Sequence, residues 1–267
     1  MILKKVKGKV KKFRDKRKNE LSIKYKSNQI HFDLTNNISK QWFLPRYRNG
    51  DLHEPSVCHL IHENLSDNGT FIDIGANLGF FSVLFAKIRP NSQVYSIEID
   101  PNLVTLIEKN AKLNNITNLH IIHAAIHNCT GMLIDYAPIQ NDNLSTNTII
   151  SNNTKVHSHV SSITVTLDDM IKDKNINSVD VVKIDVEGAE IFAIEAMYSM
   201  LKKLKPVVLM ELHSKAIETW GYNTENILNT FENFNYRCYA VHSHRSYDYD
   251  ITSVDWKNLT HNQMLIF

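Results

Sequence analysis

The sequence has little of what marks several large classes of protein. It has 3 cysteines, Cys58, Cys129 and Cys238, and none lies at a spacing typical of a metal site. We expect three buried thiols in a reducing compartment, the cytoplasm. No apolar run approaches the roughly 18 residues of a membrane-spanning helix. The N-terminus has charges but no apolar segment of the kind that a secretory signal requires, so we expect no such signal.

Positive charge is scarce outside the N-terminus. The 267 residues carry 30 Lys or Arg and 28 Asp or Glu, a net charge of +2. Residues 1–20 hold ten basic and two acidic residues, a net of +8, which leaves 20 basic and 26 acidic residues and a net of −6 for the rest. A mildly acidic body disfavours a nucleic-acid groove, so we expect no nucleic-acid partner.

The basic segment of residues 1–20 has the pattern of an amphipathic helix. Its apolar residues recur at helical spacing between lysines: Ile2, Leu3, Val6, Val10 and Phe13. This pattern favours peripheral contact with an anionic membrane, at the inner face of the cell membrane. A solvated tail and a helix packed on a partner protein are the alternatives.

The remaining chain predicts one α/β domain at residues 53–267, with residues 21–52 as a cap. Strands alternate with helices, which indicates a doubly wound, mostly parallel sheet of seven strands. We expect strands near 70–74, 93–97, 119–123, 179–184, 206–212, 236–241 and 262–267, and helices near 54–65, 79–88, 101–114, 167–173, 189–203 and 223–233. No convincing helix precedes the last strand, so we expect it to be antiparallel.

Residues 128–162 interrupt this alternation with a polar, asparagine-rich stretch. An insertion at this point lies at the ligand-binding end of the sheet, where binding loops belong. It is our candidate for a lid over the acceptor substrate, with a disordered surface loop as the alternative.

The segment at residues 70–81 predicts a buried strand, a glycine turn and the start of a helix. It lacks the Gly-x-Gly-x-x-Gly pattern of a dinucleotide site, because Asn77 and Phe80 occupy the second and third glycine positions. A dehydrogenase is therefore disfavoured. Asp73 ends the strand, where a carboxylate could neutralise a bound cation. S-adenosylmethionine, with its ammonium and sulfonium charges, suits this arrangement, and an ordinary strand-turn-helix is the alternative.

Glu98 ends the next strand, about twenty residues after the glycine turn. A carboxylate at this position can accept hydrogen bonds from both hydroxyls of a ribose, in S-adenosylmethionine or in NAD. The alternative is a solvated charge at a strand end. Ala125, after the third strand, is expected near the adenine, and Glu54 and Phe80 are further candidate contacts of the cofactor.

A second group of polar residues follows the fourth and fifth predicted strands. Asp185 and Glu187 follow the first of these, while Glu211 and His213 end the second and point the same way. We expect all four to converge at one rim of the sheet. A carboxylate or His213 could accept the proton of a substrate hydroxyl. Alternatively, Asp185 and Glu211 could bind Mg²⁺, which would lower the pKa of that hydroxyl. The simplest alternative is that the acids cap helices and His213 bonds locally.

Two histidine pairs are ambiguous. His242 and His244 follow the sixth predicted strand at the same edge, while His157 and His159 lie in the insertion. They could contact the acceptor or a metal ion, but an ordinary polar loop is the favoured interpretation.

Five segments together resemble the FkbM family of S-adenosylmethionine-dependent methyltransferases, over about residues 53–213. They are residues 71–79 (FIDIGANLG), 98–101 (EIDP), 165–169 (VTLDD), 183–190 (KIDVEGAE) and 211–213 (ELH). The resemblance implies a Rossmann-like fold and methyl transfer, usually to oxygen. Many such enzymes act on glycans, lipids or secondary metabolites. The motif of nucleic-acid amino methyltransferases, Asp/Asn-Pro-Pro-aromatic, is absent after the fourth strand, and so is a Pro-Cys nucleophile.

We therefore expect an O-methyltransferase whose glycine turn (Gly75, Asn77 and Gly79) shapes the methionine pocket. Asp73 is expected at the charged end of the methionine and Asp185 beside the methyl group. The expected acceptor is a sugar hydroxyl of a bacterial surface polysaccharide or lipid-linked glycan. A soluble metabolite as the acceptor, and a non-catalytic scaffold that binds the cofactor, are the alternatives.

Overall fold

The computed structural model describes residues 19–47, 49, 52–137, 148–149, 160–254, 259 and 263–267. Nearly all of the predicted amphipathic segment 1–20 lies outside these residues, as do His157, His159 and the middle of the insertion 128–162. The membrane-binding helix and the lid therefore stay predictions. No described helix is both long and apolar enough to cross a bilayer.

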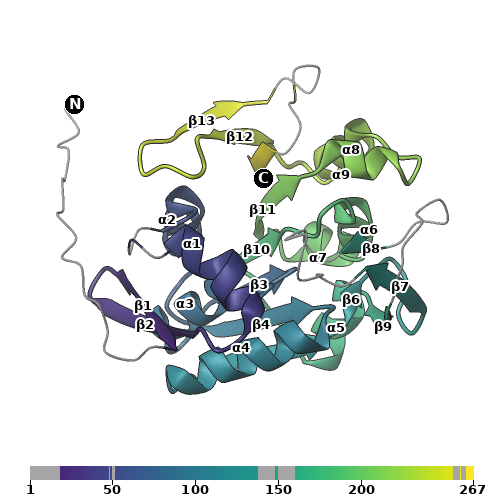
Figure 1. Cartoon of the computed structure of the whole chain (residues 1–267). Coiled ribbons are helices and arrows are strands. Elements are labelled where there is room, and N and C mark those ends of the chain that lie inside the picture. Colours follow the sequence, from purple (N-terminus) through teal and green to yellow (C-terminus); the bar gives the residue numbers. More distant parts are fainter. Residues whose placement is uncertain are drawn as a thin grey trace, which may run out of the picture.

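A large mixed sheet forms the centre of the described chain (Figure 1). Its eight strands lie in the order β13 (Asp250–Ser253), β12 (Tyr239–His242), β14 (Gln263–Ile266), β11 (Val207–Leu212), β10 (Val181–Ile184), β3 (Thr70–Ile74), β4 (Gln93–Glu98) and β5 (Leu119–His123). From β11 to β5 all neighbours are parallel. Strand β14 is antiparallel to both β11 and β12, which confirms the predicted direction of the last strand. The edge strand β13 extends the seven predicted strands by one.

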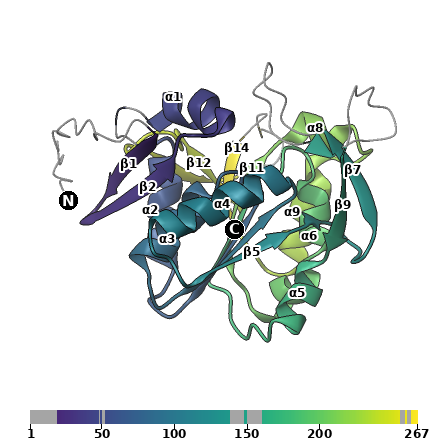
Figure 2. The same cartoon turned by 60° about the horizontal axis from the view of Figure 1, so that its bottom comes forward.

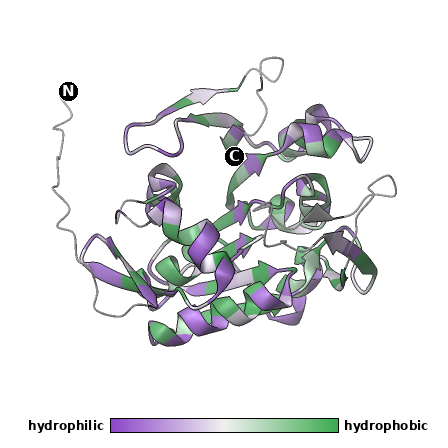
Figure 3. Cartoon of the chain, in the orientation of Figure 1, coloured by the Kyte–Doolittle hydropathy of each residue, from purple (hydrophilic) through white to green (hydrophobic). Residues whose placement is uncertain are grey.

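Helices cover both faces of this sheet, as a doubly wound fold requires (Figure 2). The helices α2 (Pro55–Asn64), α3 (Phe80–Ile88) and α4 (Pro101–Leu113) pack on one face, and α5 (Leu167–Asp173), α6 (Glu190–Glu195), α7 (Tyr198–Lys203) and α9 (Thr224–Asn233) pack on the other. Successive strand residues point to opposite faces, so Phe71 belongs to one hydrophobic core and Ile72 to the other. Helix α4 alternates between apolar and polar residues along its length (Figure 3), and its buried Leu103 and Leu106 face the sheet side.

The N-terminal residues form a hairpin, β1 (Glu20–Tyr25) and β2 (Asn28–Asp33), followed by the π-helix η1 (Ser39–Phe43) and α1 (Leu44–Tyr47). The backbone N–H of Asp33 donates to the side chain of Asn110 on α4 at 2.8 Å. The Phe32 and Phe43 rings pack in a tilted arrangement against Phe80, the first residue of α3. These contacts place η1 and α1 directly over the glycine turn.

Some predicted elements differ from the structure. The predicted helix 189–203 is divided into α6 and α7, because the Asp168 carboxylate accepts hydrogen bonds from the N–H groups of Ser199 and Met200 and so caps a new helix. The sequence analysis missed the short helix α8 (Ser214–Glu218). It also missed a second sheet in the order β6 (Ala125–Ile126), β9 (Val160–Val165), β7 (Leu133–Ala137) and β8 (Thr148–Ile149), which frames the insertion.

Candidate active site

The glycine turn between β3 and α3 presses directly against the end of β10. Gly75 has a φ of +74°, and a Cβ built on it would lie 1.9 Å from the carbonyl oxygen of Asp185, so only glycine fits here. The N–H groups of Gly75 and Ala76 both donate to the carbonyl of Ile97, at 3.0 and 3.1 Å. The turn therefore holds the ends of β3, β4 and β10 together and exposes its backbone toward a cavity.

Glu98 is buried at the end of β4 beside this turn. One carboxylate oxygen accepts from the N–H of Asn77 at 2.7 Å, and the other accepts from the N–H of Asp100 at 3.0 Å. These bonds fix the orientation of the carboxylate, since Asn77 has the left-handed φ of +54° that aims its N–H at Glu98. A carboxylate oriented in this way is suited to accept hydrogen bonds from two vicinal hydroxyls.

A cavity of about 420 Å³ extends from Glu98 across the glycine turn to the ends of β10 and β11. This volume lies within the range of small-molecule sites, roughly 300–1,000 Å³. Most of the predicted site residues line it: Glu54, Gly75, Asn77, Phe80, Glu98, Ala125, Asp185, Glu187 and Glu211. The structure therefore brings together the two groups that the sequence analysis placed on separate strands.

Two predicted contacts of the cofactor do not line this cavity. Asp73 has no exposed surface, and its carboxylate accepts from the N–H and hydroxyl of Ser82 at 3.1 and 2.5 Å. Burial raises the pKa of Asp73, against the opposing effects of Lys183 and Ser82. The prediction that Asp73 contacts the ligand is corrected, because this side chain anchors the first turn of α3. Gly79 instead allows close packing, since a Cβ there would lie 3.0 Å from Ile107.

Lys183 is a buried cation that the sequence analysis did not select. It is 2% exposed, and its Nζ lies 3.2 Å from a carboxylate oxygen of Asp185. Burial favours its neutral form, but the negative charges of Asp185, Asp73 and Glu54 outweigh burial and raise the pKa of Lys183. Burial raises the pKa of Asp185, but the positive charges of Lys183 and His213 outweigh burial and hold this pKa below its ordinary value. Both partners are therefore charged.

His213 lies behind the cavity lining and between two carboxylates. Its Nδ1 is 2.9 Å from Glu190, and its Nε2 is 3.3 Å from Glu187. Burial would lower the pKa of His213, but the hydrogen bond to Glu190 and the nearby negative charges raise it to about 9. His213 is therefore protonated at neutral pH. This makes it a poor general base, contrary to one of the two predicted roles.

Glu211 lines the cavity and is 7% exposed. Burial, with the negative charges of Asp185 and Glu54, raises its pKa to about 7. One carboxylate oxygen lies 3.7 Å from Arg245. The ligand atoms of Asp185, Glu211 and His213 lie within 4.8 Å of one another, so these residues converge as the sequence analysis expected.

Several residues of this cavity were missed because they carry no motif. Trp42 and Arg46 come from η1 and α1, and the Arg46 guanidinium lies 4.3 Å above the Trp42 ring. His53 precedes α2, and burial, with the charges of Arg245 and Arg46, lowers its pKa to about 4. Arg245 enters from the loop after β12. Only the fold brings these distant segments to one place.

Comparisons with known proteins bear on the family and the fold of the chain. A family model described as the methyltransferase FkbM domain matches residues 73–238. The structure is similar to a methyltransferase FkbM from Methylobacillus flagellatus KT, with a TM-score of 0.53 and 14% identity over 84% of this chain and 50% of that one. The chain thus spans about half the length of that protein. The chain is also similar to M. jannaschii TYW2 in complex with AdoMet, with a TM-score of 0.45 and 14% identity over 96% of this chain and 88% of that one. No curated protein matches the sequence.

Proposed function

Because the chain belongs to the FkbM methyltransferase family, we propose that it transfers the methyl group of S-adenosylmethionine to a sugar hydroxyl of a bacterial surface polysaccharide or lipid-linked glycan. One observation carries this proposal: a single cavity has an oriented carboxylate for a ribose at one end and a group of acid–base side chains at the other. A nucleoside bound at Glu98 would thus extend toward Asp185 and Glu211.

The residues present fit S-adenosylmethionine. Glu98 offers acceptors for the ribose hydroxyls, and Ala125 lies on the cavity wall where a larger side chain would take the space of an adenine. The close contact of Gly75 with Asp185 keeps the turn free of side-chain atoms where the methionine part would lie. Among the described residues that line the cavity, carboxylates outnumber cationic side chains, which favours a ligand with ammonium and sulfonium charges.

The cofactor, when bound, supplies an electrophilic methyl group. The protein must then hold an acceptor oxygen in line with that group and take its proton. Glu211 is the best placed base, because it lines the cavity and its pKa of about 7 allows it to accept a proton near neutral pH. Asp185 and Glu187, on the same wall, position the acceptor. His213 acts through Glu187 and Glu190, which it holds in place.

The prediction of Mg²⁺ at Asp185 and Glu211 has weaker support. Asp185 already has a cation, since Lys183 lies 3.2 Å from its carboxylate. His213, the third side chain of that group, has carboxylates at both ring nitrogens. A metal ion at this position would have to compete with two cations of the protein itself.

The acceptor side of the proposal depends on two observations. Trp42 and Arg46 line one cavity wall with the guanidinium stacked over the indole ring, and the donors of this pair suit a sugar with hydroxyl or acidic groups. The basic segment 1–20 would bring the enzyme to lipid-linked precursors at the inner face of the cell membrane. A soluble metabolite as the acceptor remains the second candidate, and the same cavity would serve it.

Two measurements test the proposed function. Calorimetry with S-adenosylmethionine and S-adenosylhomocysteine should show one site per chain. If neither compound binds, the proposed methyltransferase activity is refuted. A transfer assay with methyl-labelled cofactor against sugars, lipid-linked sugars and soluble metabolites should label a sugar oxygen. Label on a soluble metabolite alone would refute the glycan acceptor and leave the methyl transfer intact.

A further inference from the structure

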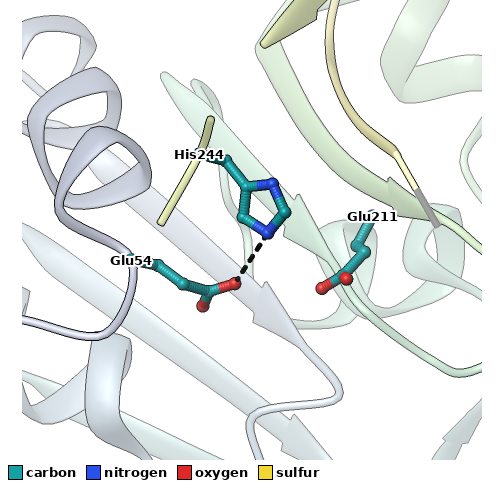
Figure 4. A group of neighbouring side chains, drawn as sticks. All are labelled: Glu54, Glu211 and His244. Carbon is teal, nitrogen blue, oxygen red and sulfur yellow. Dashed lines mark ion pairs between the residues drawn. The ribbon is translucent and has the colours of Figure 1, made fainter. Parts of the chain in front are cut away.

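A second group of polar side chains lies at the acceptor end of the cavity. Glu54 comes from the start of α2, Glu211 from the end of β11, and His244 from the turn after β12 (Figure 4). Their ligand atoms lie within 4.8 Å of one another, and the Nε2 of His244 is 3.7 Å from a carboxylate oxygen of Glu54. Three distant segments of the chain therefore direct two carboxylates and one imidazole at a common point.

Among the described residues, the Nε2 of His244 and the carboxylate of Glu54 have no partner outside this group, while Glu211 also lies 3.7 Å from Arg245. The Nε2 of His244 is buried and has no hydrogen-bond partner among the described residues. Glu54 is only 7% exposed, and His244 is the one side chain in the described part of the chain to which its carboxylate is paired. Buried polar atoms are normally hydrogen-bonded, so atoms of this kind that face one another indicate a ligand.

The neighbouring group of Asp185, Glu211 and His213 is different. Lys183 neutralises Asp185, and His213 interacts with Glu187 and Glu190 through both ring nitrogens. Glu211 belongs to both groups, so His244 and His213 distinguish them. Free lone pairs, which a metal ion needs, are found on the side of His244.

The loop that carries His244 is fixed against the helix that carries Glu54. The hydroxyl of Ser56, two residues after Glu54, donates to the carbonyl oxygen of His244 at 2.6 Å. A turn closes the same loop, since the N–H of Ser246 donates to the carbonyl of Ser243 at 2.7 Å. The two ligands are thus positioned before any ion arrives, which lowers the entropic cost of binding.

We propose that Glu54, Glu211 and His244 bind a divalent first-row transition metal ion, for which Mn²⁺ is the probe. Carboxylates suit hard cations and imidazole suits transition metals, so the mixed set favours such an ion over Mg²⁺. Metal–ligand distances of about 2.1 Å allow ligand atoms up to roughly 4.2 Å apart. The distance of 3.7 Å between the Nε2 of His244 and the Glu54 oxygen is within this limit. A small movement of the Glu211 side chain would bring its carboxylate oxygen within the same limit of the other two ligand atoms.

Arg245 is compatible with such an ion. Its guanidinium lies 3.7 Å from Glu211, but its side chain is 57% exposed and can turn toward solvent. In a role that rests on the proposed function, the ion would bind the acceptor hydroxyl in an open position facing the cavity. It would lower the pKa of that hydroxyl; with Glu211 then bound to the ion, the proton would pass to another carboxylate of the same wall, Glu187.

The test is Mn²⁺ binding to the full-length protein after chelator treatment, followed by electron paramagnetic resonance of the free ion. We expect one Mn²⁺ per chain. His244→Ala and Glu54→Gln should each raise the dissociation constant by at least roughly tenfold, since even residues that only orient a ligand contribute 10–100-fold. His242→Ala is the matched control, because His242 lies two residues away and bonds Thr252 instead. It should bind Mn²⁺ like the unaltered protein.

The variant His213→Ala shows whether the ion binds at the group that contains His244 or at the group that contains His213. Binding that survives His213→Ala but is weakened in His244→Ala supports the proposal, while the reverse pattern overturns it. Absence of Mn²⁺ binding also overturns it, and S-adenosylmethionine binding in the same sample then shows that the proposed function stands. Circular dichroism of each variant confirms that it is folded, and His244→Asn repeats the test with a smaller change of volume.

Discussion

The buried cation Lys183 offers the sharpest test of the electrostatics of the site. Replacement by methionine keeps most of the side-chain volume but leaves the Asp185 carboxylate without its nearest positive charge. Removal of one partner of a buried ion pair typically costs about 3–5 kcal/mol. Asp73 and Glu54 also lose a stabilising charge, which places the expected loss in the upper part of that range. The assay is urea unfolding followed by circular dichroism.

The shift of the urea midpoint is the loss of unfolding free energy divided by the unfolding slope, which increases with chain length. An unfolding slope of roughly 3 kcal/mol per molar urea converts this loss into a midpoint lower by roughly 1–2 M. Lys109→Met is the matched control, because Lys109 pairs with Asp33 at 2.9 Å but its side chain is 48% exposed. The half-exposed ammonium is screened by water, and the Asp33 carboxylate keeps its hydrogen bonds from Thr35, so this loss should be smaller than that of Lys183→Met.

The loss in Lys183→Met should depend on pH with a definite sign. With Lys183 present, the folded-state pKa of Asp185 is lowered, so this group stabilises the fold above its unfolded pKa. Without Lys183, burial dominates and raises the folded-state pKa, so the ionised carboxylate destabilises the fold. The deficit should therefore be largest near pH 8 and shrink toward pH 4. The double variant Lys183→Met/Asp185→Asn should recover most of the lost stability. Equal midpoints at pH 8 for Lys183→Met and the unaltered protein would refute the reasoning.

Four further predictions follow, three from the site and one from the N-terminal segment. Glu98→Gln should weaken S-adenosylmethionine binding roughly tenfold in calorimetry, since an uncharged acceptor replaces a charge-assisted one; unchanged affinity would contradict the ribose role. Glu211→Gln should lower kcat by roughly 10²–10⁴-fold while cofactor affinity changes little, as expected for loss of a base; a loss confined to KM would contradict it. Asp185→Asn should abolish turnover with cofactor binding largely intact, and normal turnover would remove Asp185 from the mechanism. Deletion of residues 1–20 should abolish binding to anionic liposomes, and equal binding would refute the membrane role.

The fold was predictable from the sequence because its central strands are short, apolar and separated by clear helix signals. The resemblance to the FkbM family is confirmed by the family model, and β3, β4 and β5 occupy almost the predicted residues. The small sheet around the insertion was missed. Exposed residues such as Leu133 and Ile163 alternate there with polar ones too briefly to give a pattern.

The candidate site was predictable only where a strand end implied it. Glu98, Asp185 and Glu211 lie at the same ends of three parallel strands of one sheet, so topology alone brings them to one edge. Asp73 also ends such a strand, but its side chain turns toward Ser82, an orientation that strand position does not determine. Lys183 could have been selected, because a lysine within a fully buried strand requires carboxylate partners.

Residues from the cap and from the loop after β12 could not be predicted. Arg46 and His244 lie in segments without periodicity or motif. Arg46 lines the cavity and His244 lies beside Glu54, which lines it, through contacts between distant parts of the chain. The bond between Ser56 and the carbonyl of His244 joins residues 188 positions apart. No spacing rule describes a contact of that kind.

The central claim is that one cavity holds the cofactor at Glu98 and the reacting group at Asp185 and Glu211. A crystal structure with S-adenosylhomocysteine tests it most directly. The account predicts both ribose hydroxyls within hydrogen-bond distance of the Glu98 carboxylate, with the sulfur directed toward Asp185 and Glu211. A nucleoside bound elsewhere, or a sulfur directed away from these two carboxylates, would contradict it.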